Sequence, residues 1–194
     1  MAKHSQKWLN TIYYLIPFTR NYNERMTGSE IARYMKCPQR TIARHLEILH
    51  SKGILKSREL GNRKEYYIDL NNPISNNILN LIETTKAIEF ISQNMKINIL
   101  VQEFLKYGTV VIFGSFAKKQ TNLDSDIDIL FIGKKSRGVE KIVMRSPMKL
   151  HIQYSTVKNL ITLLNNKNAL ANEIKRNHII FGDVDMLIEV FKNE

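Results

Sequence analysis

Apolar side chains in the first part of the chain recur at helical spacing. From Trp8 to Phe18 they occupy the i, i+3, i+4 and i+7 positions of an amphipathic helix. Thr27-Gly28-Ser29-Glu30 then has the form of a capping box, in which a Thr hydroxyl and a Glu carboxylate satisfy free backbone amides at the start of a helix. The pattern therefore predicts one helix over residues 8–18 and a second that continues through Met35.

A third helix and a hairpin are expected next. Pro38 suits the first turn of a helix that ends near Gly53. The apolar residues on one face of that helix are Ile42, Leu46 and Leu49. Beyond it, the segments ILKSREL and KEYYIDL flank Gly61-Asn62-Arg63. Turn residues between two segments rich in apolar and β-branched residues predict a β-hairpin with a basic tip.

The chain is then expected to continue as helix. Asn71-Asn72-Pro73 ends the first pattern, and Pro73 is expected to open a helical connector. Its apolar residues are Ile74, Ile78, Leu81 and Ile82. A further helix is expected from about Lys86 to Lys106.

From Tyr107 onward the pattern changes to short apolar runs that alternate with helical stretches. Such alternation is typical of an α/β layer. Strands are expected at residues 110–113, 127–132 and 149–155. Helices near residues 157–164 and 169–176 precede the segment HIIFG and a last helix that runs through Phe191.

The expected fold class is therefore α/β (α+β), with a mixed sheet in the C-terminal domain. We expect three parts. Residues 1–72 hold the helices and the hairpin, residues 73–96 form the helical connector, and residues 97–194 form the α/β domain.

The positive charge of the chain is concentrated in its first part. The net charge is +11, and residues 1–70 contain 13 Lys and Arg against 6 Asp and Glu, so this part carries +7. A small basic domain favours a polyanionic partner, because binding to phosphates releases condensed counterions. A solvated basic surface is the alternative.

Other features of the composition exclude several classes of protein. The single cysteine, Cys37, rules out an internal disulfide and leaves no Cys cluster to hold zinc. No run approaches the length of about 18 apolar residues that a membrane span needs, and the N-terminal segment lacks the apolar core of a signal peptide. We therefore expect a cytoplasmic protein without membrane binding.

The three helices and the hairpin resemble the winged helix-turn-helix DNA-binding domain of many bacterial and archaeal regulators. The resemblance covers residues 8–70 and is carried by the segment MTGSEIARYMKCPQRTIARHLEILHSKGIL. It implies double-stranded DNA as the partner and a third helix that enters the major groove. It also implies a homodimer, because such regulators usually read two half-sites.

The resemblance identifies candidate DNA contacts on two elements. On the third helix, the residues that face away from the apolar side are Gln39, Arg40, Thr41 and Arg44. Arg can donate two hydrogen bonds to guanine, Gln can pair with adenine, and Thr can contact a phosphate or a thymine methyl group. At the hairpin tip, Arg63 and Lys64 are expected to reach the DNA backbone or the minor groove. The alternative is a protein-binding or dimerising module whose charges are only solvated.

A second motif lies in residues 113–130, FGSFAKKQTNLDSDIDIL. Gly114-Ser115 is followed by ten residues and then by Asp126-Ile127-Asp128. A strand delivers Gly114-Ser115 to a helix start, where backbone amides can hold the phosphates of a nucleotide. Residues two apart on a strand point to the same face, so Asp126 and Asp128 are expected to project toward that phosphate site and to share Mg²⁺. Lys118 can contact phosphates or be solvated.

This motif resembles the nucleotidyltransferase superfamily that includes DNA polymerase beta, and in particular its minimal nucleotidyltransferases. The resemblance implies that Asp126 and Asp128 are catalytic and metal-binding residues, and that Gly114, Ser115 and Lys118 bind the nucleotide. It also implies Mg²⁺ as the cofactor and a nucleoside triphosphate as the substrate, with ATP as the first candidate. In this superfamily the metal ions neutralise developing charge while pyrophosphate leaves.

The chain departs from the family pattern at one position. Active members usually carry a third carboxylate on the following strand, where it completes the metal site and can accept the proton of the attacking hydroxyl. Here that strand, residues 148–154, contains neither Asp nor Glu. His151 and Gln153 are the nearest replacements, but neither supplies negative charge for a hard cation.

Two hypotheses follow. In the first, the protein is a DNA-binding transcriptional regulator whose second domain binds Mg²⁺ and a nucleoside triphosphate and transfers a nucleoside monophosphate to a protein hydroxyl. In the second, it is a transcription factor without catalysis, whose degenerate nucleotidyltransferase domain is a ligand sensor or a dimerisation platform. The absent third carboxylate favours the second hypothesis. The joint presence of Gly114, Ser115, Asp126 and Asp128 favours the first. The connector, residues 73–95, is the candidate dimer interface, unless its apolar face packs on the α/β domain.

Overall fold

A computed structural model describes residues 11–118 and 126–193 of the chain. These residues form two compact units, Met1–Thr85 and Lys86–Glu194, which we describe separately as the first and the second unit. One long helix, α4 (Ser75–Gln93), begins in the first unit and ends in the second. No helix in the described ranges is long and apolar enough to span a bilayer.

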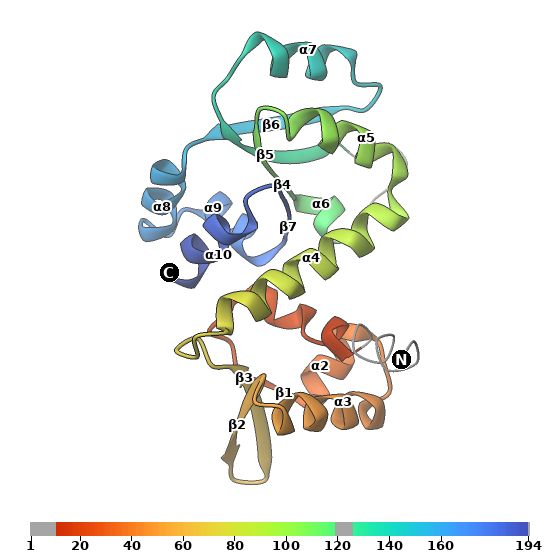
Figure 1. The fold of residues 1–194 in the computed structure, drawn as a ribbon, viewed down its shortest axis with the longest axis vertical. Helices are drawn as coiled ribbons and strands as arrows, with labels where there is room; N and C mark the ends of the chain where they lie inside the picture. Colours follow the sequence, from red (N-terminus) through yellow and green to blue (C-terminus); the bar gives the residue numbers. More distant parts are fainter. Residues whose placement is uncertain (1–10, 119–125, 194) are drawn as a thin grey trace. The chain divides into compact units, whose positions relative to one another are not determined.

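The first unit combines helices with a small antiparallel sheet (Figure 1). Its elements are η1 (Ile16–Arg20), β1 (Met26–Thr27), α2 (Gly28–Met35), α3 (Gln39–Ser51), β2 (Leu55–Leu60) and β3 (Arg63–Ile68). The strand order is β1-β3-β2, and Leu60 pairs with Arg63 at the end of the β2–β3 hairpin. Gly61 and Asn62 form the turn, so the predicted hairpin is present and Arg63 begins its second strand.

The start of α2 confirms the predicted capping box. The Thr27 hydroxyl accepts a hydrogen bond from the Glu30 amide at 3.3 Å, and the Glu30 carboxylate accepts one from the Thr27 amide at 2.7 Å. The Thr27 hydroxyl also donates to this carboxylate at 2.8 Å, and the two bonds that the carboxylate accepts lower the pKa of Glu30. The helix ends at Met35 as predicted, where Lys36 adopts the left-handed conformation.

The apolar face of α3 forms the core of the first unit. Ile42, Leu46 and Leu49 are fully buried, as their spacing predicts. The first half of α4 joins this core through a polar contact, in which the hydroxyl of the buried Tyr22 donates to the Glu83 carboxylate at 2.8 Å. Burial, with Glu83 beside it, raises the pKa of Tyr22 well above its usual value.

Two predicted helix boundaries are wrong. The first helix does not continue to Phe18, because the chain turns at Tyr14 and continues as the 3₁₀ helix η1, which has Pro17 in its first turn. Residues 8–10 of that prediction lie outside the described residues. Further on, α4 begins at Ser75 and runs through Lys86 to Gln93. The break therefore falls at Asn94, whose side-chain amide donates to the carbonyl of Phe90 at 2.8 Å.

The second unit contains the predicted mixed sheet. Its strands are β4 (Gly108–Phe113), β5 (Ile127–Gly133), β6 (Leu150–Ser155) and β7 (His178–Phe181), in the order β6-β5-β4-β7. β4 is antiparallel to β5 and to β7, whereas β5 and β6 are parallel. The three strands predicted between residues 110 and 155 are confirmed, and HIIF forms the fourth.

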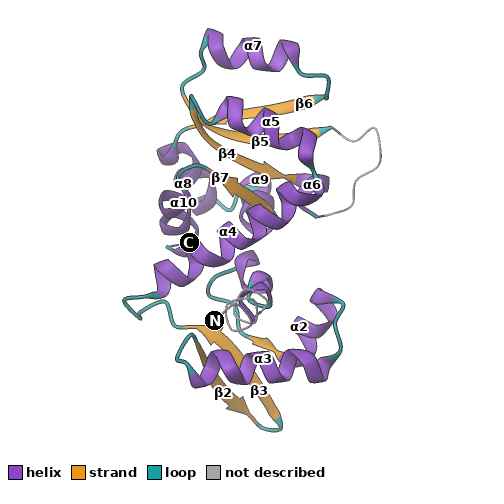
Figure 2. Ribbon diagram, turned by 45° about the vertical axis from the view of Figure 1, so that its right-hand side comes forward, coloured by secondary structure: helices purple, strands orange, loops and turns teal. Residues whose placement is uncertain are grey.

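Helices cover both faces of this sheet (Figure 2). α5 (Met95–Phe104) and α7 (Arg137–Arg145) lie on one face, where they share a buried core with the end of α4 and with alternate residues of the strands. α8 (Val157–Asn165), α9 (Ala169–Arg176) and α10 (Val184–Lys192) lie on the other face. On that face the ring of the buried His178 contacts the ring of Phe191 in α10, with centroids 4.9 Å apart.

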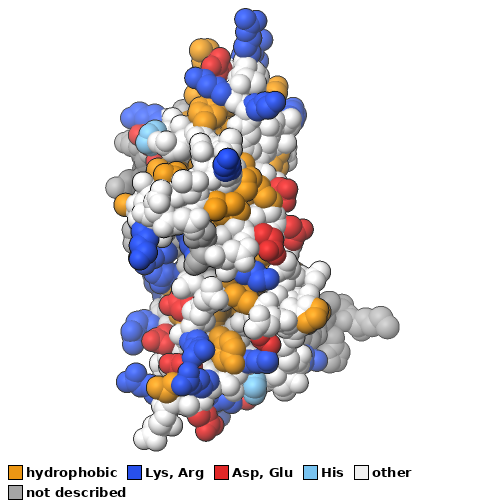
Figure 3. Space-filling view, turned by 90° about the vertical axis from the view of Figure 1, so that its left-hand side faces the viewer, with side chains coloured by type: hydrophobic (Ala, Val, Ile, Leu, Met, Phe, Trp, Pro, Cys, Tyr) orange, Lys and Arg blue, Asp and Glu red, His pale blue; other side chains and the backbone are white. Residues whose placement is uncertain are grey.

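The helix α7 is not predicted by the sequence pattern. It is short, and only Val139 and Ile142 among its residues are buried. Gly138 permits its close approach to the end of α5, because a Cβ at this position would overlap the ring of Tyr107. Three of its nine residues are basic, and Lys and Arg side chains gather at this end of the second unit in Figure 3.

Candidate functional site

The turn between β4 and the single helical turn α6 (Gly114–Ala117) begins at a glycine with positive φ. Gly114 has φ +69°, which glycine adopts more readily than other residues. A Cβ built on Gly114 would overlap the carboxylate of Asp128, whose Cγ would lie only 3.1 Å away. Because it lacks a side chain, glycine allows another group to approach closely at this position. The structure identifies the Asp128 carboxylate as the group that approaches.

The two aspartates lie at the start of β5. Asp126 immediately precedes the strand and is exposed, and Asp128 is its second residue, with a side chain that is 29% exposed. The strand register places Asp128 between Phe113 of β4 and His151 of β6. Residues 113–114, 128 and 151 therefore lie together at one end of three neighbouring strands. This end of the sheet is open to solvent.

A histidine of β6 lies directly beside Asp128. The Nδ1 atom of His151 is 3.2 Å from Oδ1 of Asp128, and its Nε2 atom is 3.2 Å from Nε2 of Gln153. If Nδ1 carries the proton, it donates to the carboxylate and Nε2 accepts from the amide of Gln153. The His151 side chain is 63% exposed, so this polar chain lies at the surface of the site.

The donor set fits a magnesium ion only together with a substrate. Carboxylate oxygens are suitable ligands for Mg²⁺, which commonly uses one or two carboxylates together with substrate phosphates. Asp126 and Asp128 provide this pair. Across residues 11–118 and 126–193 there is no cluster of three or more His, Cys, Asp and Glu side chains that could hold a metal by itself.

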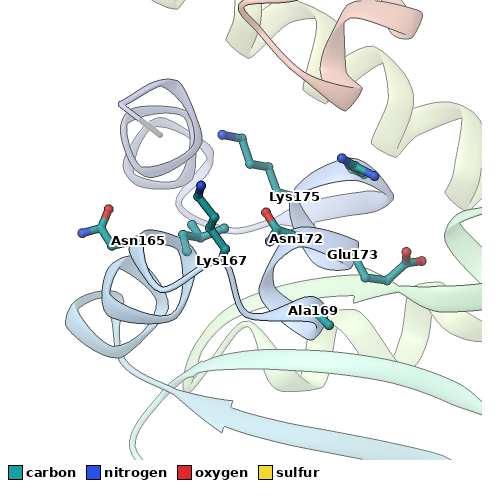
Figure 4. Close-up of a pocket in the computed structure, with 8 residues that line it drawn as sticks. Asn165, Lys167, Ala169, Asn172, Glu173 and Lys175 are labelled. Carbon is teal, nitrogen blue, oxygen red and sulfur yellow. The ribbon is translucent and has the colours of Figure 1, made fainter.

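Lys118, the predicted phosphate contact, forms an ion pair. Its Nζ atom lies 2.6 Å from Oε1 of Glu173 in α9, and both side chains are about one-third exposed. Glu173 also lines an open hollow of about 620 Å³ between α8 and α9 (Figure 4). In Figure 4, Lys167 and Lys175 extend to one side of this hollow, whereas Glu173 points away from them. The sequence gives no sign of the Lys118–Glu173 pair, because the two residues are far apart along the chain.

The candidate DNA contacts lie on the exposed side of α3 and at the hairpin. Gln39, Arg40 and Arg44 are exposed, and Thr41 is half-buried. The Gln39 side-chain amide donates to the Ser29 hydroxyl at 2.9 Å, which ties the start of α3 to α2. The structure thus brings these four side chains to one end and one side of α3.

The two hairpin cations differ in their surroundings. Arg63 is exposed at the tip. Lys64 forms an ion pair with Glu47 of α3 at 2.7 Å and lies over the ring of Tyr66. This hydrogen-bonded contact raises the pKa of Lys64 and lowers that of Glu47. Glu47 therefore competes with any phosphate for Lys64. Arg63 forms no such ion pair among the described residues, although its charge contributes to the lowered pKa of Glu30.

Comparison with protein families identifies the second unit. The family model described as "Polymerase beta, Nucleotidyltransferase" matches residues 85–185, which include Gly114, both aspartates and His151. The comparisons with curated proteins and with solved structures gave no match.

Proposed function

Because the chain belongs to the polymerase beta nucleotidyltransferase family, we propose that its second unit binds Mg²⁺ with a nucleoside triphosphate and transfers a nucleoside monophosphate. The observation that carries this proposal is the contact between Gly114 and Asp128, which leaves no room for a side chain at the start of α6. A domain that served only as a platform would have no need of this arrangement. ATP is the first nucleotide to test.

Each residue of the site has a separate role in the proposed transfer. The backbone amides of Gly114 and Ser115, at the first positions of α6, would bind phosphate oxygens. Asp126 and Asp128 would hold Mg²⁺, which supplies charge neutralisation when bound. The oxygen of an acceptor hydroxyl bonds to the α-phosphorus, the bond from that phosphorus to the bridging oxygen breaks, and pyrophosphate leaves. His151 holds the Asp128 carboxylate in place and is a nitrogen base that can take the hydroxyl proton.

We propose a protein hydroxyl of tyrosine, serine or threonine as the acceptor, ahead of a small molecule. The test is incubation of the protein with Mg²⁺ and each nucleoside triphosphate labelled at the α-phosphate, with and without a host lysate. Label on protein that disappears with EDTA supports transfer. Nucleotide that binds without label on any protein or small molecule supports the second candidate, a non-catalytic sensor, which the absence of a carboxylate in β6 favours.

Restoring the third carboxylate provides a separate test. We expect His151→Asp to raise Mg²⁺-dependent transfer about tenfold, because position 151 lies directly beside Asp128 and a carboxylate there adds negative charge to the metal site. The new pair of like charges should also lower Tm without Mg²⁺ and raise it when Mg²⁺ is added. His151→Asn is the matched control without charge. Equal transfer rates for the two variants would mean that the missing carboxylate does not limit the reaction.

We further propose that the first unit is a winged helix-turn-helix that binds double-stranded DNA and makes the protein a transcriptional regulator. Three features support this proposal: the α2–α3 pair, the β2–β3 hairpin that follows it, and the exposed Arg40 and Arg44 on α3. α3 would read the major groove, and Arg63 would contact the backbone beside it.

The DNA proposal predicts a loss of specific affinity. Arg44→Ala should weaken binding to a selected genomic fragment about tenfold, because one Arg–base contact contributes about 1–3 kcal/mol of discrimination. Fluorescence anisotropy with specific and scrambled fragments measures the effect. Arg176→Ala, which removes the same charge from exposed α9, is the control. Similar losses in both variants would contradict base recognition by α3.

A homodimer is the third part of the proposal. Its support is the apolar side chains that the second unit leaves exposed near its start: Ile88 on α4, and Met95 and Ile99 on the first turns of α5. Ile88, Met95 and Ile99 are each about two-thirds exposed. We expect Ile88→Glu with Ile99→Glu to convert a dimer into a monomer in light scattering. A wild-type monomer at micromolar concentration would exclude this interface.

A further inference from the structure

The outer side of α7 carries a regular row of cations. Arg137, Lys141 and Arg145 are spaced by four residues, so they lie on one side of the helix at intervals of about 6 Å. All three are exposed. Val139 and Ile142, on the opposite side of α7, are buried. Their packing in the core keeps the row on the outer side of the helix.

The end of α5 extends this row. Lys106 and Tyr107 line a shallow hollow of about 180 Å³ together with Lys141 and Arg145. Gly138 lets the two helices approach closely enough to form it. We refer to Arg137, Lys141, Arg145 and Lys106 as the α7 row.

Nearby carboxylates leave this positive charge largely unbalanced. The Oε1 atom of Glu140 lies 3.5 Å from Nζ of Lys135, so Glu140 forms its ion pair with a residue outside the row. Glu103 is exposed at the edge of the hollow. Among the described residues, no member of the α7 row forms an ion pair.

We propose that the α7 row is a second nucleic-acid contact, which binds the phosphate backbone of double-stranded DNA. Cations repeated at even intervals match a polymer with evenly spaced charges, because each can reach a different phosphate. A protein partner fits less well, since the centres of protein interfaces are depleted of charged residues. The row lies on the side of the sheet opposite α8, α9 and α10 and belongs to a helix that the nucleotide site does not use. The choice of DNA rests on the proposed function of the first unit.

The dependence of DNA affinity on salt tests this proposal in the full-length chain. Substitution of Arg137, Lys141 and Arg145 by Gln keeps good helix formers at exposed positions, so the fold should be retained. The slope of log affinity against log salt is negative, and each lost phosphate contact reduces its magnitude by about 0.9. The magnitude of the slope should therefore fall by about 2.7 in the triple variant. The matched control is Lys158→Gln, Lys167→Gln and Arg176→Gln, which removes the same charge from exposed positions on and beside α8 and α9 and should leave the slope nearly unchanged.

Combination with Arg44→Ala separates failure of this proposal from failure of the DNA-reading proposal. If affinity responds to Arg44→Ala and the slope does not respond to the α7 substitutions, the α7 row is not a DNA contact. Equal losses of slope in the α7 and control variants would likewise overturn it, because net charge would then explain both. If the slope responds to the α7 substitutions while Arg44→Ala has no effect, the α7 row is supported and base reading by α3 is wrong. Absence of DNA binding by the wild-type chain at low salt would overturn both.

Discussion

Replacement of Asp126 and Asp128 together by asparagine is expected to abolish Mg²⁺-dependent nucleotide binding. The strand register brings Asp128 to the Gly114 turn, and Asp126 lies two residues before it at the start of β5. Asparagine keeps their size but removes two negative charges, so a bound cation would lose its protein ligands. We expect affinity for the magnesium–nucleotide complex to fall at least about 100-fold, equal to about 2.8 kcal/mol, and label transfer to disappear.

The fold should survive this double substitution. The side-chain amide that Asp128→Asn introduces can still accept a hydrogen bond from His151, and position 126 is exposed. Isothermal titration with Mg²⁺ and ATP measures the affinity, and thermal unfolding without ligand measures the stability. The control is Asp185→Asn with Glu189→Gln, which removes the same charge from the exposed side of α10. Unchanged nucleotide binding in the aspartate variant would show that the site has been assigned to the wrong residues.

Local signals in the sequence predicted much of the fold. The capping box at Thr27 and the apolar face of α3 depend on residues within one or two helical turns, and the structure has both as predicted. β4 and β5 were predicted because each is a compact apolar run, and β6 because apolar and polar residues alternate along it. The break at Asn94 was not predicted, since apolar residues continue on both sides of it and only the hydrogen bond to Phe90 marks the end of α4.

Features that depend on contacts between distant segments were predicted only in part. The sequence placed His151 and Gln153 on the strand that lacks a carboxylate, but the contact with Asp128 depends on the register of β5 and β6. The pairing of Lys118 with Glu173 depends on how α9 packs, which no local pattern encodes. α7 was missed although Val139, Ile142 and Val143 have the i, i+3, i+4 spacing of a helix, because the element is only nine residues long.

Substitution of Gly114 by alanine is expected to impair the site as strongly as loss of the aspartates. The backbone at this position has φ +69°, where a side chain costs about 1–2 kcal/mol. The added methyl group would also overlap the Asp128 carboxylate and force it away from the turn. Since the carboxylate is the movable end of a side chain, we expect most of the damage to appear as lost nucleotide affinity, by at least about 100-fold, which corresponds to about 2.8 kcal/mol.

Gly61 provides a matched control for the backbone strain at Gly114. It has φ +58° in the hairpin turn, and an added Cβ there would meet no atom within 4 Å. Gly61→Ala should therefore cause a comparable loss of stability, measured by chemical unfolding, while Mg²⁺-dependent nucleotide binding remains at the wild-type level. If Gly114→Ala bound nucleotide as well as Gly61→Ala, the position of the Asp128 carboxylate could not be what the site requires. If Gly114→Ala alone lost binding, the close contact between this glycine and Asp128 would be established as the feature that makes the turn a nucleotide site.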